Sequence, residues 1–224
     1  MFSIREAKSR RRFLQDAAWL GAGMCSSAFA AGGQDEADAF DSLPKSVWGN
    51  ARRNGLIMIH RPAPALLSHH TQIVRGGELG RPLIVEGQVF APDGQTSLEG
   101  MTVYAYNTDS DGYYGSDHKE YPPRLYGWMK TDARGHFELH TIHPGHYPGM
   151  HVPAHVHFTV WGGGYPPQWV EELRFEGDRF ITAHMLAEAA EQGEFSSIRP
   201  LTQTEDGVLH CRYKMRMQTE TNFR

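Results

Sequence analysis

Histidine is concentrated in one stretch of the chain. Seven of the 13 histidines lie between residues 136 and 157. Within this stretch, one apolar residue separates His155 from His157, so on an extended strand both imidazoles project to the same side while Val156 and Phe158 face the other. Such a pair can chelate iron, copper, zinc or nickel, and it does not by itself select one of these metals.

Two tyrosines in turns could complete a metal site with these histidines. Tyr147 lies in the Pro- and Gly-containing phrase over residues 143–148, shortly before the histidine pair, and Tyr114 follows Gly112 in an earlier turn. A phenol titrates near pH 10, so it becomes a ligand at neutral pH only when a strongly Lewis-acidic ion stabilises the phenolate. Ferric iron is such an ion. Two phenolates and two neutral imidazoles would leave it with about one net positive charge and an open position.

The side chains near these four residues are given structural interpretations. Tyr113 is the alternative to Tyr114 if the register of the turn shifts by one residue. Most of the remaining histidines of the stretch are expected at the surface or beside the metal ligands: His136, His140, His143, His146 and His151. Three acidic residues are interpreted as sheet-edge and turn charges rather than as a paired acid and base: Glu171, Glu172 and Glu176.

Short strands are the elements that must position these residues. From Leu83 onward, apolar or alternating runs are separated by glycine, proline and Asp-Gly turns, which is typical of an antiparallel sandwich. The expected strands are Leu83 to Phe90, Met101 to Asn107, Tyr126 to Lys130, His136 to Thr141, His155 to Trp161 and Leu173 to Glu176. Helical spacing predicts one short helix over Ile181 to Gln192, ended by Gly193. The predicted fold class is all-β: an antiparallel β-sandwich with an irregular N-terminal arm and one short C-terminal helix.

The C-terminal run adds one more strand. Its apolar residues alternate with polar or basic ones, and they are Leu209, Cys211, Tyr213, Met215 and Met217. Because Cys211 falls on the apolar face, it is predicted to be a buried small hydrophobe rather than a nucleophile.

The composition limits the class of protein. The chain has 224 residues, of which 40% are hydrophobic, and this is enough for one ordinary core. Its formal net charge of -4 gives no electrostatic reason to expect nucleic acid or an anionic membrane surface as a partner. No stretch is apolar and long enough for a permanent membrane-spanning helix. The sequence leaves open whether the protein forms a homo-oligomer.

The N-terminus has the pattern of an export signal. Three arginines at residues 10–12 precede the moderately apolar run from Ala17 to Met24, and Ala28-Phe29-Ala30 supplies the small residues before a cleavage site. We therefore expect a bacterial twin-arginine signal peptide over residues 1–30, cleaved after Ala30, and a periplasmic or secreted protein. The predicted domains are this signal, an irregular arm over residues 31–80 and a β-sandwich domain over residues 81–224.

Five phrases, in this order, resemble the motifs of the intradiol ring-cleavage dioxygenases, and in particular those of protocatechuate 3,4-dioxygenase subunits. The phrases are Asp111 to Tyr114, Lys130 to Phe137, Thr141 to Pro148, Pro153 to Phe158 and Phe175 to Asp178. The resemblance covers residues 83–178. It implies a β-sandwich, in agreement with the strands expected from the residues themselves.

The resemblance also implies a mononuclear Fe(3+) centre. Tyr114 and His155 would be equatorial ligands, and Tyr147 and His157 would be axial ligands. A catechol-type substrate would displace Tyr147, which could then take up a substrate proton, and O2 would open the ring between its two hydroxylated carbons. The implied catalytic residues are Tyr147 and Tyr114.

Two positions depart from the family pattern. Val152 directly precedes the Pro-Ala-His-x-His phrase, where the family usually has arginine, and Glu172 stands where glutamine is frequent. An acidic side chain there would repel an anionic substrate, while Arg124, Arg134 or Arg174 could supply positive charge from elsewhere. Two alternatives therefore stay open: a metal-binding β-sandwich that has lost ring cleavage, and a zinc or copper protein that uses the His-rich stretch.

Overall fold

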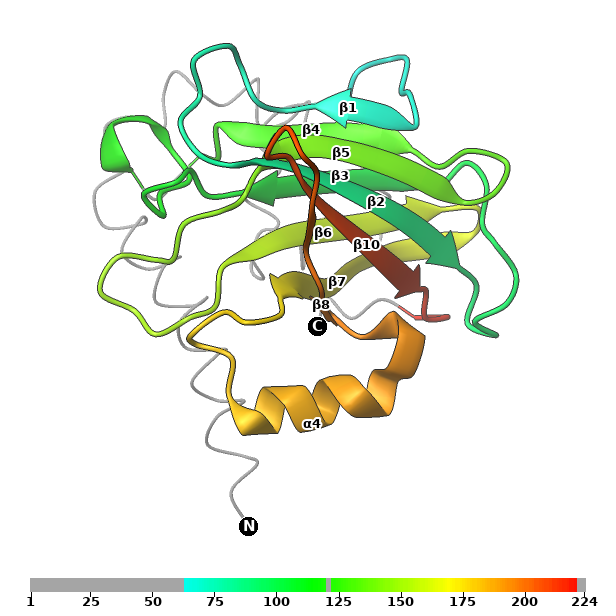
Figure 1. The fold of residues 1–224 in the computed structure, drawn as a ribbon. Coiled ribbons are helices and arrows are strands. Elements are labelled where there is room, and N and C mark those ends of the chain that lie inside the picture. The colour runs from blue at the N-terminus through cyan, green and yellow to red at the C-terminus, as the bar shows by residue number, and fades with distance from the viewer. Residues whose placement is uncertain (1–62, 120–121, 221–224) are drawn as a thin grey trace, which may run out of the picture.

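Two five-stranded sheets pack face to face in the computed structural model, which describes residues 63–119 and 122–220 (Figure 1). The predicted export signal and most of the predicted arm lie outside the described residues. The first sheet has the order β1-β5-β2-β10-β9 and the second has the order β4-β3-β6-β7-β8. The chain is thus a β-sandwich, as the alternating runs of the sequence predicted.

Most of the expected strands are present, with ends within one or two residues of those predicted. In the first sheet the strands are β1 (His70–Gln72), β5 (His136–Ile142), β2 (Pro82–Phe90), β10 (Leu209–Arg216) and β9 (Thr202–Gln203). In the second sheet they are β4 (Leu125–Lys130), β3 (Thr102–Asn107), β6 (His155–Gly162), β7 (Tyr165–Phe175) and β8 (Ile198–Arg199). Pairing is antiparallel except for β1 with β5, β10 with β2 and β7 with β8.

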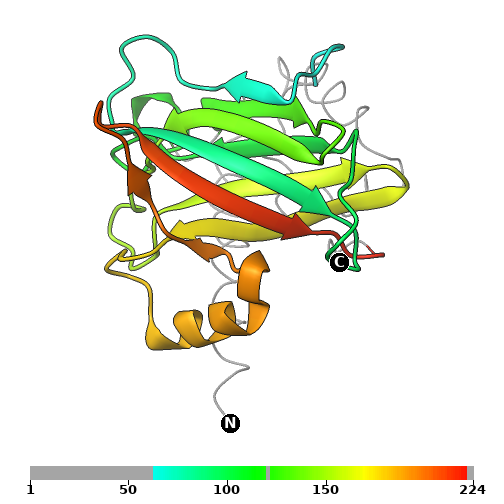
Figure 2. The ribbon, with the colours of Figure 1, turned by 45° about the vertical axis from the view of Figure 1, so that its right-hand side comes forward.

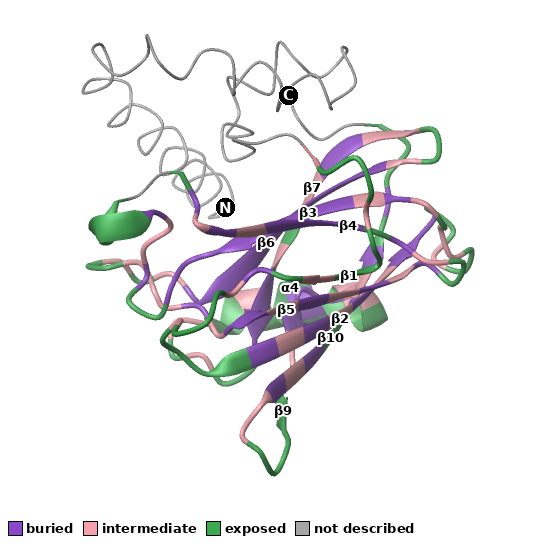
Figure 3. Ribbon diagram, turned by 90° about the horizontal axis from the view of Figure 1, so that it is seen from above, coloured by how far each residue is buried: buried purple, intermediate pink, exposed green. Residues whose placement is uncertain are grey.

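Residue alternation decides which side chains enter the core. Buried and more exposed residues alternate along β2 and β10 (Figure 3), so these strands bury one face and leave the other to solvent. Cys211 belongs to the buried face, as the sequence predicted. Strand β6 is different, because seven of its eight residues are buried. Its outer face must therefore be covered by other parts of the chain.

The single α-helix of the described residues lies outside the two sheets (Figures 1 and 2). Helix α4 (Ala183–Gln192) begins after Thr182, whose side-chain oxygen accepts a hydrogen bond from the backbone N–H of Met185. It ends at Gly193. The described residues also contain two short 3-10 turns, η3 (Ser116–His118) and η4 (Gly193–Phe195). No helix in this described part combines the length and the apolar character needed to cross a membrane.

Four elements differ from the sequence-based expectation. The segment predicted to be an irregular arm contains β1, and the very short strands β8 and β9 were not predicted. Strand β7 begins at Tyr165 rather than at Leu173. Its first half contains two prolines and pairs only with β6 among the described residues, so it is an edge segment where proline is tolerated. Because of these prolines, the sequence did not predict the first half of this strand.

Candidate metal centre

The histidine pair lies on the outer face of β6. Val156 and Phe158 point into the core between the sheets, so His155 and His157 project outward from the second sheet. The ring of His157 stacks on that of Tyr106, its cross-strand neighbour on β3, with ring centroids 4.5 Å apart. The side chain of His157 is 3% exposed and that of His155 is 8% exposed. The strand alternation therefore places both imidazoles on this face, and the stacking on Tyr106 orients that of His157.

Two loops at the same end of the second sheet carry the tyrosines. The Tyr114 loop (residues 108–119) follows β3, and the Tyr147 loop (residues 143–154) joins β5 to β6. Their backbones are hydrogen-bonded directly, because the Gly145 N–H donates to the Asp109 carbonyl at 2.8 Å and the Thr108 hydroxyl donates to the Gly145 carbonyl at 2.8 Å. The two loops thus form one packed unit.

Glycine permits this close approach. A Cβ atom on Gly145 would lie 2.5 Å from the Ser110 carbonyl oxygen and 2.6 Å from the Gly112 nitrogen. A Cβ atom on Gly112, where φ is +91°, would lie 1.9 Å from the His146 carbonyl oxygen. All three obstacles are backbone atoms, which cannot rotate away as a side chain can. Glycine at both positions is therefore required for the tyrosines to meet.

Four donor atoms converge above β6. The Tyr114 hydroxyl lies 2.8 Å from His157 Nε2, and the Tyr147 hydroxyl lies 2.9 Å from His155 Nε2 and 3.4 Å from His157 Nε2. The two imidazole Nε2 atoms are 2.9 Å apart, and the two phenol oxygens are in direct contact. Each donor atom thus has at least two of the other three within 3.4 Å.

Burial keeps all four groups neutral when only protons are available. Desolvation raises the pKa of Tyr114 and of Tyr147 above that of an ordinary phenol, and the charge of Glu172 contributes to both shifts. Desolvation likewise lowers the pKa of His155 and lowers that of His157 further, with the neighbouring imidazole adding to the effect on His157. Neutral imidazoles are the form that binds metals. The phenols can ionise here only if a cation replaces their protons.

The orientation of the histidine rings also fits a metal. His155 Nδ1 is 2.7 Å from the Pro153 carbonyl oxygen, which can only accept, so Nδ1 carries the proton and the lone pair of Nε2 faces the other donors. His157 Nδ1 is buried and has no hydrogen-bond partner among the described residues. Two oxygen donors and two nitrogen donors at these spacings match the ligand set of a single ion with open positions.

The carboxylate of Asp178 contacts several of the segments around the four donor atoms. One carboxylate oxygen accepts from the Ala154 N–H at 2.9 Å and lies 2.9 Å from His146 Nε2, and the other accepts from the Phe180 N–H at 2.9 Å. Burial opposes ionisation of this carboxyl group, but the three donors outweigh it and hold its pKa below the usual value. This side chain links both ends of the Tyr147 loop to the turn after β7.

The arginines that could have supplied positive charge are all paired. Arg124 is ion-paired with Glu78 and Asp109, and Arg134 lies 3.8 Å from Asp132. The buried Arg174 on β7 pairs with Glu172 at 2.6 Å and with Glu171 at 3.1 Å. Arg174 is also the cross-strand neighbour of His155. The cation beside His155 is therefore paired with two carboxylates.

The structure separates the predicted residues into two groups. It brings Tyr114, Tyr147, His155 and His157 together, whereas the ring of Tyr113 stacks on His118 instead. Four of the other five histidines of the stretch make side-chain contacts elsewhere: His140 with Glu138, His143 with Phe175, His146 with Asp178 and His151 with Phe180. Tyr106 could not be predicted from the sequence, because only the β3 to β6 register reveals its stacking on His157.

Comparison with known proteins supports the same family. The family described as Dioxygenase matches residues 58–219. The chain is 31% identical over 119 residues to a chlorocatechol 1,2-dioxygenase from Cupriavidus pinatubonensis, covering 46% of each protein. It is 31% identical over 120 residues to a protocatechuate 3,4-dioxygenase beta chain from Burkholderia cepacia, covering 48% of this chain and 51% of that protein. The chain thus matches about half the length of these curated relatives.

Solved structures share the fold. A 3-chlorocatechol 1,2-dioxygenase from Rhodococcus opacus superposes with a TM-score of 0.55 at 19% identity, covering 97% of this chain and 94% of that one. An intradiol ring-cleavage dioxygenase from Tetranychus urticae gives a TM-score of 0.53 at 19% identity, covering 71% of this chain and 92% of that one. At this level of identity, the likeness concerns the sandwich itself.

The packing of the two loops generates a prediction. The change Gly145→Ala should push the Tyr114 loop away from the Tyr147 loop and lower metal affinity by at least about 10-fold, because support around metal ligands typically contributes that much. Elemental analysis of the folded variant measures the effect. The control is Gly76→Ala, since a Cβ atom on Gly76 meets nothing within 4 Å. Full metal content in the Gly145 variant would show that the loop contact does not set the site.

Proposed function

The chain belongs to the intradiol ring-cleavage dioxygenase family, and we propose that it is an exported non-haem Fe(III) dioxygenase that opens a catechol-type ring between its two hydroxylated carbons with O2. The observation that carries this proposal is the convergence of two phenol oxygens and two imidazole nitrogens within 3.4 Å above β6. Members of this family use non-haem iron, and the donor set suits a trivalent ion.

The proposed ligands are Tyr114, Tyr147, His155 and His157. Their side chains differ in how firmly they are held. The imidazoles project from a buried strand, whereas both tyrosines are half-buried and stand on loops. Bound ferric iron would act as a Lewis acid that binds the catechol oxygens and makes the ring reactive toward dioxygen. A tyrosine on a loop is the ligand that can move aside for a substrate at the least cost to the fold.

Tyr147 is the residue we assign to proton transfer. Its phenol oxygen lies next to that of Tyr114 and to both Nε2 atoms, so a proton released by a substrate hydroxyl can be held at this oxygen. Burial and the charge of Glu172 raise its pKa, so the free side chain keeps a proton once it has accepted one. The buried imidazoles stay neutral and keep their positions beside the tyrosines.

Glu172 affects which class of catechol the site would accept. It is ion-paired with Arg174, the neighbour of His155 on the outer face of the sheet, and its charge influences the pKa of both tyrosines and of His155. Val152 supplies no charge before the histidine pair. With the adjacent cation neutralised and an acidic group present, we propose that the substrate is a catechol without a carboxylate on its ring.

Export is a separate part of the proposal. The arginine triplet over residues 10–12, the apolar run after it and the Ala28-Phe29-Ala30 site support transport by the twin-arginine machinery to the periplasm or beyond. The mature protein should then begin at Ala31. N-terminal sequencing of protein from the cell envelope or medium tests this, and an intact Met1 on folded cytoplasmic protein would contradict it.

The dioxygenase activity is tested by colour, metal and oxygen uptake. Purified protein should contain one iron, absorb visible light through tyrosinate-to-iron charge transfer and consume one O2 per catechol. Tyr147→Phe should lower the rate of oxygen uptake at least about 100-fold, the usual contribution of a positioned proton-transfer group. Tyr113→Phe is the matched control, because Tyr113 contacts His118 instead.

Two results would contradict the activity as proposed. A coloured iron protein without oxygen uptake would indicate a metal-binding relative that has lost ring cleavage. A colourless protein that contains zinc or copper in these four positions would exclude the ferric centre.

The substrate charge is tested with Glu172→Gln. Removing this carboxylate should raise kcat/KM for 3,4-dihydroxybenzoate about 3- to 10-fold relative to that for catechol, because a repulsion of about 1 kcal/mol at a partly solvated site is relieved. Glu188→Gln on α4 is the control, since Glu188 is half exposed and lies beside His184. An unchanged ratio of kcat/KM values would show that Glu172 does not select against anionic rings.

A further inference from the structure

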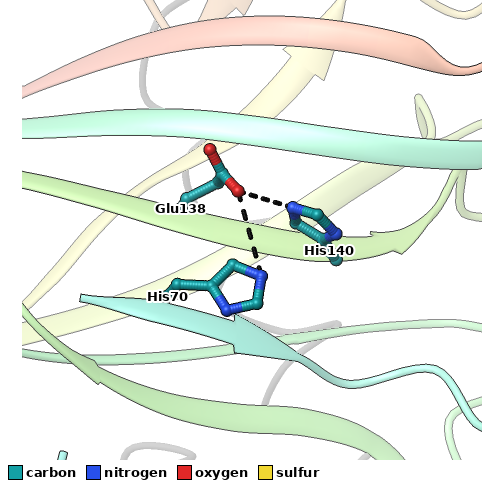
Figure 4. Close-up of side chains that lie close together, drawn as sticks. All are labelled: His70, Glu138 and His140. Atoms are coloured by element: carbon teal, nitrogen blue, oxygen red, sulfur yellow. Dashed lines mark hydrogen bonds and ion pairs between the residues drawn. The ribbon is translucent and has the colours of Figure 1, made fainter. Parts of the chain in front are cut away.

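A second group of histidine and carboxylate side chains lies on the opposite face of the sandwich. Phe137 and Leu139 of β5 enter the core, so Glu138 and His140 project from the outer face of the first sheet. His70 stands on the neighbouring strand β1, directly across from Glu138 in the parallel pairing. Figure 4 shows the three side chains meeting above β1 and β5. None of them belongs to the tyrosine and histidine centre.

The geometry brings three ligand atoms together. His140 Nε2 is 2.6 Å from Glu138 Oε1, and His70 Nε2 is 3.9 Å from the same oxygen. The ligand atoms all lie within 4.8 Å of one another, and the two rings meet edge to face with centroids 4.5 Å apart. Tetrahedral zinc with bonds of about 2.1 Å separates its ligand atoms by about 3.4 Å, so small side-chain rotations would reach that arrangement.

The backbone fixes the three positions. Glu138 and His140 are two residues apart on one strand, and hydrogen bonds between β1 and β5 hold His70 in register with them. The side chains are 31 to 46% exposed, so an ion can reach them and a water molecule can fill the fourth position. A nearby carboxylate, Glu86, is directed to Arg212 at 2.7 Å instead.

We propose that His70, Glu138 and His140 form a second metal site, which binds a divalent ion of the zinc class. Two imidazoles and one carboxylate are the ligand types such ions prefer, and they differ from the two phenolates that favour trivalent iron. The ion would replace the proton that His140 shares with Glu138. It would also fasten β1, a strand of three residues, to the edge of the first sheet.

The test is a zinc titration by calorimetry on the full chain loaded with its own iron. Wild type should bind one Zn²⁺ at this site, and His70→Ala and His140→Ala should each weaken that binding at least about 10-fold. Glu138→Gln should weaken it as well, because it keeps the size of the side chain and removes the charge. His210→Ala is the control, since His210 lies on β10 of the same sheet outside the group.

Iron content and oxygen uptake should be the same in all of these variants, so a failure of this site and a failure of the dioxygenase proposal are distinguishable. Circular dichroism confirms that each variant is folded. Absence of zinc binding by wild type at micromolar concentration would overturn the proposal. So would equal affinity in wild type, His70→Ala and His140→Ala, which would leave the group as a hydrogen-bonded patch on the surface.

Discussion

Four electron-pair donors converge on the outer face of β6, and the rest of the site depends on this constraint. Two imidazole nitrogens 2.9 Å apart face two phenol oxygens in contact, and burial disfavours charge on each of them. Such a group is stable only when protons or a cation lie between its members. The lowered pKa values of the histidines keep the imidazoles neutral and able to bind a cation, and the raised pKa values of the tyrosines mean that the phenols ionise only when a cation replaces their protons.

Three features of the fold bring the four donor atoms together. Alternation along β6 places Val156 in the core and both histidines outside it. Glycine at two loop contacts lets the tyrosine loops touch through their backbones. Asp178 then joins both ends of the Tyr147 loop to the turn after β7. Rigid strands thus carry the imidazoles while loops carry the phenols, and this division allows a ligand to move without disturbing the core.

Much of the fold and of the site could be predicted from the sequence, because the patterns that reveal them involve residues close together in the chain. Period-two alternation revealed the long strands and the outward direction of His155 and His157, and turn residues marked the loops of Tyr114 and Tyr147. Contacts between segments far apart in the chain could not be predicted from the sequence. The stacking of Tyr106 on His157, the pairing of Arg174 with Glu172 and the place of β1 beside β5 all follow from sheet register, which no local pattern encodes. Prolines at an edge likewise hid the first half of β7.

Crystallography of the purified protein with anomalous data at the iron absorption edge would locate the metal relative to the four donor atoms. We expect one anomalous peak bonded to the phenol oxygens of Tyr114 and Tyr147 and to the Nε2 atoms of His155 and His157. A peak that lacks either tyrosine, or iron bound elsewhere while the four donors share only protons, would contradict it.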